Sequence, residues 1–238
     1  MSFREILAAA AAHQGIELTG EQLAAFQRYY QILSDWNSRV NITAITEPHE
    51  VAVKHMLDSL TVLDPAKFPA ACSVVDIGSG GGFPGLPLKI VRPDLKLTLL
   101  DSQNKRINFL TAVVDELGLP AVTVVHCRAE EGARQARFRE KFSVAVARAV
   151  ARLNVLCELC LPYVALGGWF VALKGDKYEE EVREAEAAIR RLGGKLNGVK
   201  QVSFPGYADN RAIIYLNKVK PTPSAYPRRP GIPEKKPL

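Results

Sequence analysis

The residues whose types and spacing suggest chemistry begin with a glycine-rich segment, Asp76-Ile77-Gly78-Ser79-Gly80-Gly81-Gly82-Phe83-Pro84-Gly85. It follows a short apolar run, Ser73 to Ile77, that predicts a buried strand. It should open a helix, because proline suits the first helical turn. Glycines allow positive φ angles and let the backbone approach a ligand closely. Ligands of open α/β sheets bind at the carboxyl ends of the strands, so the segment predicts a ligand-binding loop.

Two ligands are compatible with this loop. Gly80, Gly82 and Gly85 match the G-x-G-x-x-G fingerprint of dinucleotide sites. Gly78, Gly80 and Gly82, preceded by Asp76, match instead the acidic-x-G-x-G-x-G loop of class I methyltransferases. A strand-end carboxylate would repel a pyrophosphate, whereas it would attract the ammonium and sulfonium groups of S-adenosylmethionine. The loop therefore favours S-adenosylmethionine as cofactor, with a nicotinamide dinucleotide and a plain glycine turn as alternatives.

Further candidates stand at the ends of later strands. Asp101 follows the run Leu95 to Leu100, where a carboxylate can accept hydrogen bonds from both ribose hydroxyls, or can cap the next helix. Ala129 and Glu130 follow the third strand, where an adenine pocket is expected. Arg148 ends the fourth strand and should face the same cleft, so we expect a functional contact rather than a structural ion pair.

Basic residues suggest a polyanionic partner. Lys105 and Arg106 start a helix, where cations oppose the helix dipole, so they predict contact with RNA phosphate or else a solvated pair. The chain carries a net charge of +6, yet the segment from Lys218 onward alone holds six positive residues and one negative residue. This tail predicts a polyanion contact or a solubilising role. Its six prolines and lack of periodicity predict that it is extended or disordered until bound.

Other reactive side chains do not form a recognisable set. Cys157 and Cys160 are spaced i, i+3 on an apolar helix without a second pair, which favours core packing over a metal or redox role. The histidines have no metal-ligand spacing, and no nucleophile–base set argues for a hydrolase; they are His13, His49, His55 and His126. We therefore predict neither a metal site nor a catalytic general base.

The helices and strands that should position these residues alternate along most of the chain. Two N-terminal helices are expected, one with a capping box at Thr19 and Gln22 and one over Glu50 to Leu63. Helices then alternate with the strands 73–77, 95–100, 122–126, 142–147, 169–174, 199–204 and 212–216. This predicts an α/β fold of the class I S-adenosylmethionine-dependent methyltransferases: a Rossmann-like, seven-stranded, mostly parallel sheet with helices on both faces and an antiparallel last strand. We predict a helical extension (1–65), a methyltransferase domain (66–218) and a basic proline-rich tail (219–238).

Composition indicates the compartment. With 47% hydrophobic and 24% charged residues in 238, the chain has an ordinary globular composition. It has no run of 18 apolar residues for a membrane span and no signal-peptide pattern. The four cysteines lack the spacing of a disulfide framework, so we expect a reducing, cytoplasmic location.

Several segments together resemble one family, the RsmG (formerly GidB) family of bacterial 16S ribosomal RNA guanine-N7 methyltransferases. The resemblance covers most of the chain, and the Phe-Pro-Gly extension of the glycine loop is its most specific part. The segments are Trp36-Asn37, Val40-Asn41-Ile42-Thr43, His55-Met56-Leu57-Asp58-Ser59-Leu60, Val75 to Gly85, Asp101-Ser102, Lys105-Arg106, Arg128-Ala129-Glu130-Glu131, Ala147-Arg148-Ala149-Val150-Ala151, Lys174-Gly175 and Tyr226-Pro227-Arg228-Arg229-Pro230-Gly231. One departure is Cys127, where family members often have glycine.

The resemblance implies a substrate and a cofactor site. The substrate would be N7 of one guanine, number 527 of 16S rRNA in the 530 loop, in free rRNA or an assembling 30S subunit. S-adenosylmethionine would lie against Gly78, Phe83, Ala129, Glu130 and Arg148, with Asp101 as the ribose ligand. RNA contacts would come from Lys105, Arg106 and the tail residues Arg228 and Arg229.

Guanine N7 has a free lone pair and no proton to lose, so in-line attack on the methyl group needs no general base, only positioning. We expect a monomer. The rival interpretations are a methyltransferase for a small molecule or protein, a nicotinamide-dependent oxidoreductase and a non-catalytic RNA-binding protein.

Overall fold

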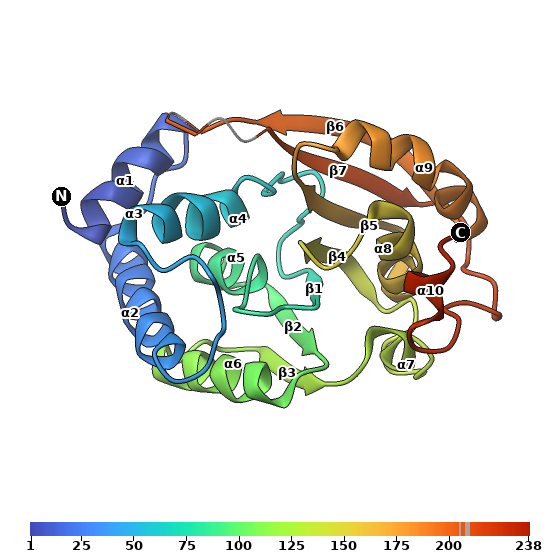
Figure 1. Ribbon diagram of the computed structural model, residues 1–238, viewed down its shortest axis with the longest axis horizontal. Helices are drawn as coiled ribbons and strands as arrows, with labels where there is room; N and C mark the ends of the chain where they lie inside the picture. The colour runs from blue at the N-terminus through green and yellow to red at the C-terminus, as the bar shows by residue number, and fades with distance from the viewer. Residues whose placement is uncertain (205, 208–209) are drawn as a thin grey trace.

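A computed structural model of the protein describes residues 1–204, 206–207 and 210–238. In this described part, seven strands form one sheet in the order β3-β2-β1-β4-β5-β7-β6 (Figure 1). The strands are β1 (Ser73–Ile77), β2 (Lys96–Asp101), β3 (Val122–His126), β4 (Phe142–Arg148), β5 (Val164–Lys174), β6 (Gly194–Val202) and β7 (Arg211–Lys218). β1 to β5 pair in parallel, and β7 runs antiparallel to both β5 and β6. The predicted fold class is confirmed.

Helices cover both faces of the sheet, with α4, α5 and α6 on one side and α8 and α9 on the other (Figure 1). Side chains of one strand alternate between the two faces: Val74 belongs to one hydrophobic cluster and Val75 to the other. The helical elements are α1 (Phe3–His13), α2 (Gly20–Asn37), α3 (Pro48–Glu50), the π-helical turn η1 (Val51–Leu57), α4 (Asp58–Leu60), α5 (Gly85–Val91), α6 (Asn104–Glu116), α7 (Ala129–Gly132), α8 (Leu153–Cys160), the 3₁₀ turn η2 (Leu161–Tyr163), α9 (Tyr178–Arg191) and α10 (Ile232–Lys235).

The N-terminal helix α2 packs on α5 and α6, two of the helices that cover the sheet. The predicted capping box is present, since Thr19 accepts a hydrogen bond from the Gln22 backbone and Gln22 accepts one from the Thr19 backbone. Phe26 and Leu33 of α2 are buried in the same cluster as Val74 of β1 and Leu99 of β2. Hydrophobic packing thus crosses residue 65, so this segment can position residues of a site at the sheet.

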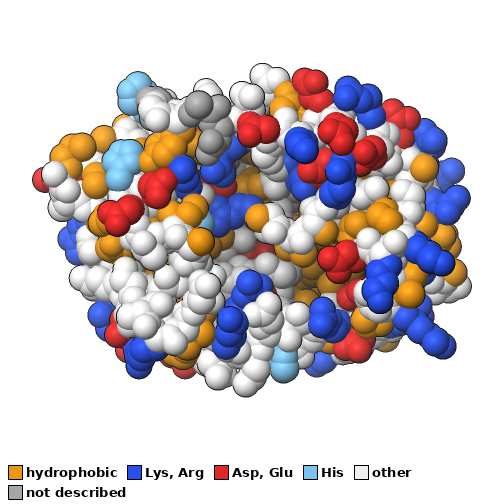
Figure 2. All heavy atoms as spheres, viewed as in Figure 1, with side chains coloured by type: hydrophobic (Ala, Val, Ile, Leu, Met, Phe, Trp, Pro, Cys, Tyr) orange, Lys and Arg blue, Asp and Glu red, His pale blue; other side chains and the backbone are white. Residues whose placement is uncertain are grey.

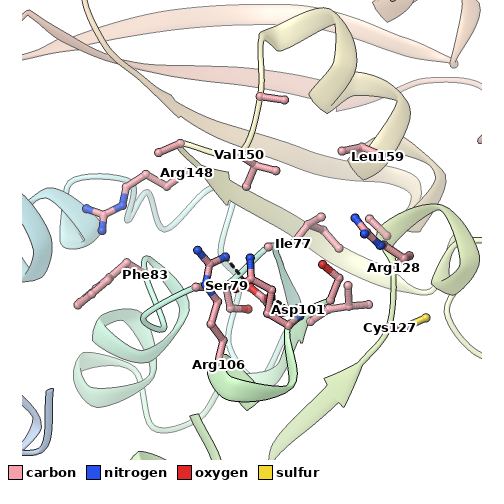
Figure 3. A pocket seen from close by; sticks show the side chains of 18 of the residues that line it. Ile77, Ser79, Phe83, Asp101, Arg106, Cys127, Arg128, Arg148, Val150 and Leu159 are labelled. Carbon is pink, nitrogen blue, oxygen red and sulfur yellow. Dashed lines mark hydrogen bonds and ion pairs between the residues drawn. The ribbon is translucent and has the colours of Figure 1, made fainter. Parts of the chain in front are cut away.

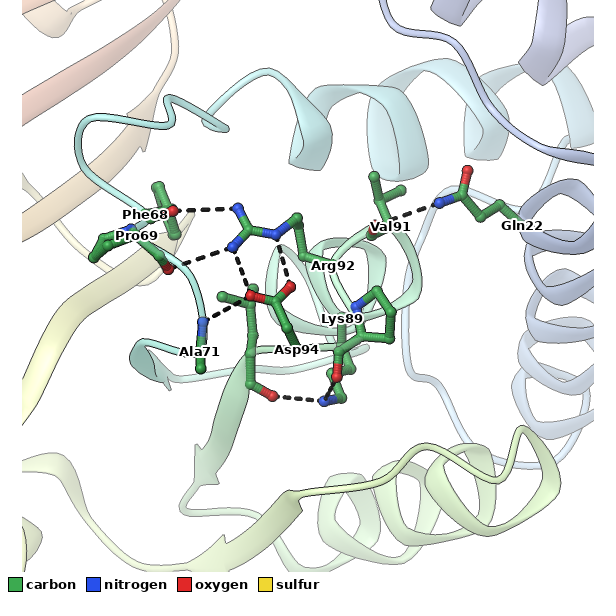
Figure 4. Close-up of polar contacts among 10 residues, drawn as sticks. Gln22, Phe68, Pro69, Ala71, Lys89, Val91, Arg92 and Asp94 are labelled. Carbon is green, nitrogen blue, oxygen red and sulfur yellow. Dashed lines mark hydrogen bonds and ion pairs between the residues drawn. The ribbon is translucent and has the colours of Figure 1, made fainter.

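An ion pair fastens the segment before β1 to the turn before β2 (Figure 4). Arg92 binds Asp94 at 2.7 Å and donates to the carbonyls of Phe68 and Pro69. Asp94 accepts from the Ala71 backbone at 2.7 Å. These contacts, the largest being the Arg92 hydrogen bond, hold the pKa of Asp94 well below its usual range. The network fixes the beginnings of β1 and β2, whose opposite ends carry the glycine loop and Asp101.

Two strands begin earlier than predicted. β5 starts at Val164, because Val164 pairs with Phe142 before the register shifts across Gly167 and Gly168. β6 starts at Gly194 rather than Val199. As an edge strand with polar, exposed residues in its first half, β6 has no apolar run there that sequence periodicity could detect.

The prediction of an extended or disordered tail is wrong for residues 219–238. Thr222, Pro227 and Pro233 are buried against the body of the protein, and α10 packs on α8. The error has a physical cause. The tail is held largely by polar contacts to Arg139, Glu158 and Glu130, whereas the expectation of disorder considered only apolar burial.

Three findings concern the cysteines, possible metal ligands and possible membrane spans. Cys157 and Cys160 are fully buried in the second hydrophobic cluster, which confirms core packing. Among the described residues, no group of three or more His, Cys, Asp or Glu side chains is placed to hold a metal ion. No helix in the described ranges combines the length and apolarity needed to cross a membrane.

Candidate active site

The glycine loop lies between β1 and α5 and forms one side of a cavity of about 580 Å³. Gly78 and Gly80 line this cavity and have φ angles of +70° and +58°, which favour glycine. A Cβ atom on Gly78 would come within 2.7 Å of Val150, a residue on the facing wall. The loop therefore brings backbone groups to the cavity surface, as the sequence predicted. Phe83 lines the cavity from the same loop.

Asp76 fixes the conformation of the glycine loop and does not face the cavity. Its Oδ2 accepts a hydrogen bond from the Gly85 backbone at 2.8 Å, and the residue is fully buried. Among the described residues, its Oδ1 has no hydrogen-bond partner, and Asp76 is not one of those that line the cavity. Burial raises the pKa of Asp76 to about 7. The sequence suggested that this carboxylate would attract the cofactor's cationic groups, whereas in the structure it is buried behind the glycine loop.

Asp101, at the end of β2, does line the cavity (Figure 3). Its Oδ2 accepts from the Gly80 backbone at 2.9 Å and from Arg106 at 3.4 Å, and its Oδ1 accepts from the Gln103 backbone at 2.9 Å. The carboxylate thus joins the glycine loop to the start of α6, so it supports the loop as well as facing the cavity. Arg106 also lines the cavity, whereas Lys105 does not and is exposed.

Ala129 and Glu130 start α7 at the opposite side of the cavity, and both line it. The Tyr163 hydroxyl donates to the Ala129 carbonyl at 2.7 Å. Glu130 is buried, and its Oε1 accepts from the Gly231 backbone at 3.0 Å. A contact between residues 101 positions apart in the chain could not be foreseen from local sequence.

Arg148 extends from the end of β4 over the ring of Phe83, 4.9 Å from its centroid (Figure 3). Its Nη1 donates to the Lys54 carbonyl at 2.7 Å and to Asp58 Oδ2 at 2.9 Å. Its Nη2 lies 3.1 Å from His55 Nδ1. Asp58 also binds Arg211 at 3.1 Å. The guanidinium is therefore fixed on several sides in the cavity wall.

Sequence reasoning missed His55, which lies in the π-helical turn. Its Nε2 is 2.8 Å from Thr43 Oγ1, and its ring packs on Phe83 with centroids 4.5 Å apart. Burial and the neighbouring Arg148 lower the pKa of His55 to about 3, so the ring is neutral. Nδ1 lies 3.1 Å from Arg148 Nη2 and also 3.1 Å from the Lys54 carbonyl. A guanidinium only donates, and the Lys54 carbonyl already accepts from Arg148 Nη1 at 2.7 Å, so we assign Nδ1 as the acceptor and the proton to Nε2. The family-like segment His55 to Leu60 was the signal that could have identified it.

The N-terminal helices contribute further support that sequence reasoning missed. The Tyr29 hydroxyl donates to the Gly81 carbonyl, and the Tyr29 ring stacks on Phe83 at 5.5 Å. Asn37 Oδ1 accepts from the backbones of Ile42 and Thr43 at 2.8 and 2.9 Å. Ile42 and Thr43 line the cavity, so this extension forms part of the site.

A second cavity, of about 590 Å³, adjoins the first. His55, Arg148 and Ala149 line both cavities and form the wall between them. The second cavity lies where the end of β5 and the start of β7 meet the π-helical turn. Besides Arg148, its charged lining residues are Lys54, Asp58, Lys174, Asp176, Lys177, Glu181 and Arg211. The arrangement can hold two ligands that meet at Arg148.

The predicted RNA-binding arginines of the tail occupy different environments. Arg228 is bound to the buried carboxylate of Glu158 by its backbone N–H at 2.7 Å and by its Nε at 2.9 Å. Its side chain is therefore an anchor of the tail, which differs from the expected RNA contact. Arg229 is exposed, as the expectation requires.

The first cavity fits S-adenosylmethionine. Its volume lies in the range of cofactor sites, about 300–1,000 Å³. The glycine backbone lets a ligand approach at Gly78, the carboxylates of Asp101 and Glu130 can accept from hydroxyl and amino groups, and Ile77 and Leu100 supply apolar surface. When bound, this cofactor supplies a methyl group on a sulfonium ion. Gly78, Gly80, Phe83, Asp101, Ala129, Glu130 and Arg148 are the residues that would hold it.

Solved structures share this fold. Geranyl diphosphate methyltransferase in complex with SAM superposes with a TM-score of 0.54 at 12% identity, over 69% of this chain and 85% of that one. A predicted O-methyltransferase, Atu636 from Agrobacterium tumefaciens, gives a TM-score of 0.54 at 18% identity, over 69% and 80%. Identities this low show the fold alone. Fold and site together define a class I S-adenosylmethionine-dependent methyltransferase.

Sequence comparison gives the family. The model of the GidB family, described as rRNA small subunit methyltransferase G, matches residues 22–213. Ribosomal RNA small subunit methyltransferase G of Desulforamulus reducens is 48% identical over 96% of this chain and 95% of its own length. The protein of the same name from Brevibacillus brevis is 49% identical over 99% and 98%. The chain belongs to the rRNA small subunit methyltransferase G family, which confirms the resemblance seen in the sequence.

Proposed function

We propose that this enzyme methylates N7 of one guanine, number 527, in the 530 loop of 16S rRNA. Membership of the family supports small-subunit rRNA as the substrate. The choice of N7 rests on one observation, which is that the groups between the two cavities are unsuited to act as a general base.

Methylation of an amino, hydroxyl or carbon acceptor requires loss of a proton, whereas guanine N7 has none to lose. His55 has a pKa lowered to about 3, mainly by burial, so it has little affinity for a proton at neutral pH. Asp58 Oδ2 is occupied by ion pairs with both Arg148 and Arg211, so it is not placed to take a proton from a substrate. The site therefore suits a nucleophile that is already unprotonated. Transfer depends on holding N7 in line with the methyl group at short range.

We place the target guanine in the second cavity, with its O6 towards Arg148 and its N7 lone pair left free to face the first cavity. O6 of guanine is an acceptor, whereas adenine presents its N6 amino group as a donor there. Arg148 offers donors only, so it favours guanine over adenine. Methylation leaves the ring cationic, and Asp58, 2.9 Å from Arg148, offsets the positive charge of that wall.

The RNA would approach across the face shown in Figure 2, where Lys and Arg side chains gather around a hollow. Lys177 lines the second cavity and is exposed, and Lys105 is exposed near the first cavity. Contacts between such cations and phosphates give salt-dependent affinity. A structured loop must unstack its guanine at a cost of a few kcal/mol. We propose that the enzyme acts as a cytoplasmic monomer on free rRNA or an assembling 30S subunit.

The test is methyl transfer from labelled S-adenosylmethionine to unmodified 16S rRNA and to small subunits, followed by mapping of the label. We expect label at N7 of guanine 527, and no label when that position carries 7-deazaguanosine. Comparison of the two substrates identifies which form of the RNA is used. Label at another atom, or persistence of label in the deaza RNA, would overturn the N7 assignment.

The alternative is a methyltransferase that acts on a small molecule or a protein. It shares the cofactor cavity but requires no basic RNA-binding face. Binding of S-adenosylmethionine without transfer to any RNA would favour this alternative over the rRNA proposal.

A further inference from the structure

The C-terminal segment, residues 219–238, follows a path across the body of the protein to the cofactor cavity; we call it the C-terminal strap. Arg139 binds its first part by donating to the carbonyls of Thr222 at 2.9 Å and Tyr226 at 2.8 Å. The Thr222 backbone donates to Glu140 at 2.7 Å. Arg134 donates to the Pro227 carbonyl. These contacts fix the direction of the strap before it reaches α8.

A buried ion pair anchors the middle of the strap. Glu158 on α8 is 1% exposed, and Arg228 binds both of its carboxylate oxygens through Nε, at 2.9 and 3.0 Å. The Arg228 backbone N–H adds a third contact at 2.7 Å. A buried carboxylate needs a charged or hydrogen-bonding partner, and the strap provides Arg228 as such a partner for Glu158. Arg228 thus ties the middle of the strap to α8.

The end of the strap reaches the cofactor cavity. Gly231, Pro233 and Glu234 are lining residues of that cavity, and Figure 1 shows α10 beside α8. Gly231 turns the chain with a φ of +79° and donates its N–H to Glu130 Oε1 at 3.0 Å. The strap therefore completes the cavity wall on the side of Glu130. It also holds the Glu130 carboxylate, which lines the cavity.

We propose that the C-terminal strap is part of the S-adenosylmethionine site, where it closes the wall around Glu130 and retains the cofactor. The proposal rests on the assignment of the first cavity to S-adenosylmethionine and does not depend on the identity of the methylated base. It assigns a cofactor role to a segment whose charge suggested RNA binding. The family model ends at residue 213, before the strap begins.

The test measures the affinity of the full-length protein for S-adenosylmethionine by titration calorimetry. Arg228→Ala should weaken binding at least tenfold, while Lys236→Ala, which removes an exposed positive charge from the same segment, should leave the affinity unchanged. Because Arg228→Ala leaves Glu158 buried without its partner, a double variant, Glu158→Met with Arg228→Met, replaces the ion pair by apolar side chains. It should fold and still bind the cofactor at least tenfold more weakly.

Trypsin cleavage after Lys235, a site that the wild type and the double variant share, provides a second measurement. We expect S-adenosylmethionine to slow this cleavage in the wild type but not in the double variant. A folded double variant with wild-type affinity, or cleavage that is indifferent to the cofactor in the wild type, overturns the proposal. Both measurements are made without RNA, so failure of the guanine-N7 assignment would leave their outcome unchanged.

Discussion

His55 offers the sharpest test of how the site positions Arg148. Its neutral ring accepts from Arg148 through Nδ1 at 3.1 Å and donates to Thr43 through Nε2 at 2.8 Å. His55→Gln places its amide near the Nε2 position, so it keeps the Thr43 contact and loses the acceptor for Arg148. His55→Asn places an oxygen near the Nδ1 position, so it keeps that acceptor. The two variants separate the positioning role from general packing.

The expected size of the effect follows from the contact that is lost. A hydrogen bond to a charged group is worth about 1.5–3 kcal/mol, and 1.36 kcal/mol corresponds to a tenfold change in rate. His55→Gln should therefore lower kcat/KM for RNA by about 10- to 150-fold. His55→Asn should recover most of this loss. Steady-state methyl transfer with each variant provides the measurement. Equal activity of His55→Gln and the wild type, or equal losses in both variants, would refute the reasoning.

His55 also predicts a pH dependence of stability. The folded state keeps the ring neutral to about pH 3, whereas the unfolded chain binds a proton near pH 6.5. The stability from the neutral ring is present above pH 6.5 and is lost as the pH falls towards 3, at about 1.4 kcal/mol per unit. The difference in unfolding free energy between the wild type and His55→Gln should therefore shrink by about 2 kcal/mol from pH 6.5 to pH 5. If urea unfolding gives the same difference between the two proteins at pH 6.5 and pH 5, this prediction is wrong.

Three further predictions concern the cofactor loop and the RNA. The unfolding free energy of Asp76→Asn should rise relative to that of the wild type by about 1.4 kcal/mol per pH unit from pH 4 to 7. The reason is that the raised pKa of Asp76 makes its ionisation costly in the folded state. Urea unfolding of both proteins at pH 5 and 7 checks this, and an equal difference in unfolding free energy at the two pH values argues against it. Asp101→Ala should weaken S-adenosylmethionine binding at least tenfold in calorimetry, since the Gly80 and Gln103 N–H groups lose their acceptor; unchanged affinity in a folded variant would exclude that role. Lys105→Ala combined with Arg229→Ala should lower the slope of log Kd for rRNA against log salt by about two and leave the cofactor affinity unchanged; an unaltered slope would place the RNA elsewhere.

The sequence predicted those strands, loops and site residues whose structure depends only on neighbouring residues in the chain. The strand Ser73–Ile77 followed by the glycine loop predicted the position of the cavity, because apolar strands and positive-φ glycines depend on neighbouring residues only. Residues at later strand ends, Asp101 and Arg148, were predicted for the same reason, since parallel strands end at one edge of the sheet. Both line the cavity.

Tertiary structure alone decided the contacts between distant segments. Local pattern does not show that Arg148 would bind His55 and Asp58, about 90 residues away, or that Asp76 would turn to Gly85. It also misjudged the C-terminal strap, because a segment with little apolar surface can still be fixed by charged groups on other elements, as Arg228 is by Glu158. Periodicity reports burial along one element, whereas buried polar groups must find partners wherever the chain brings them.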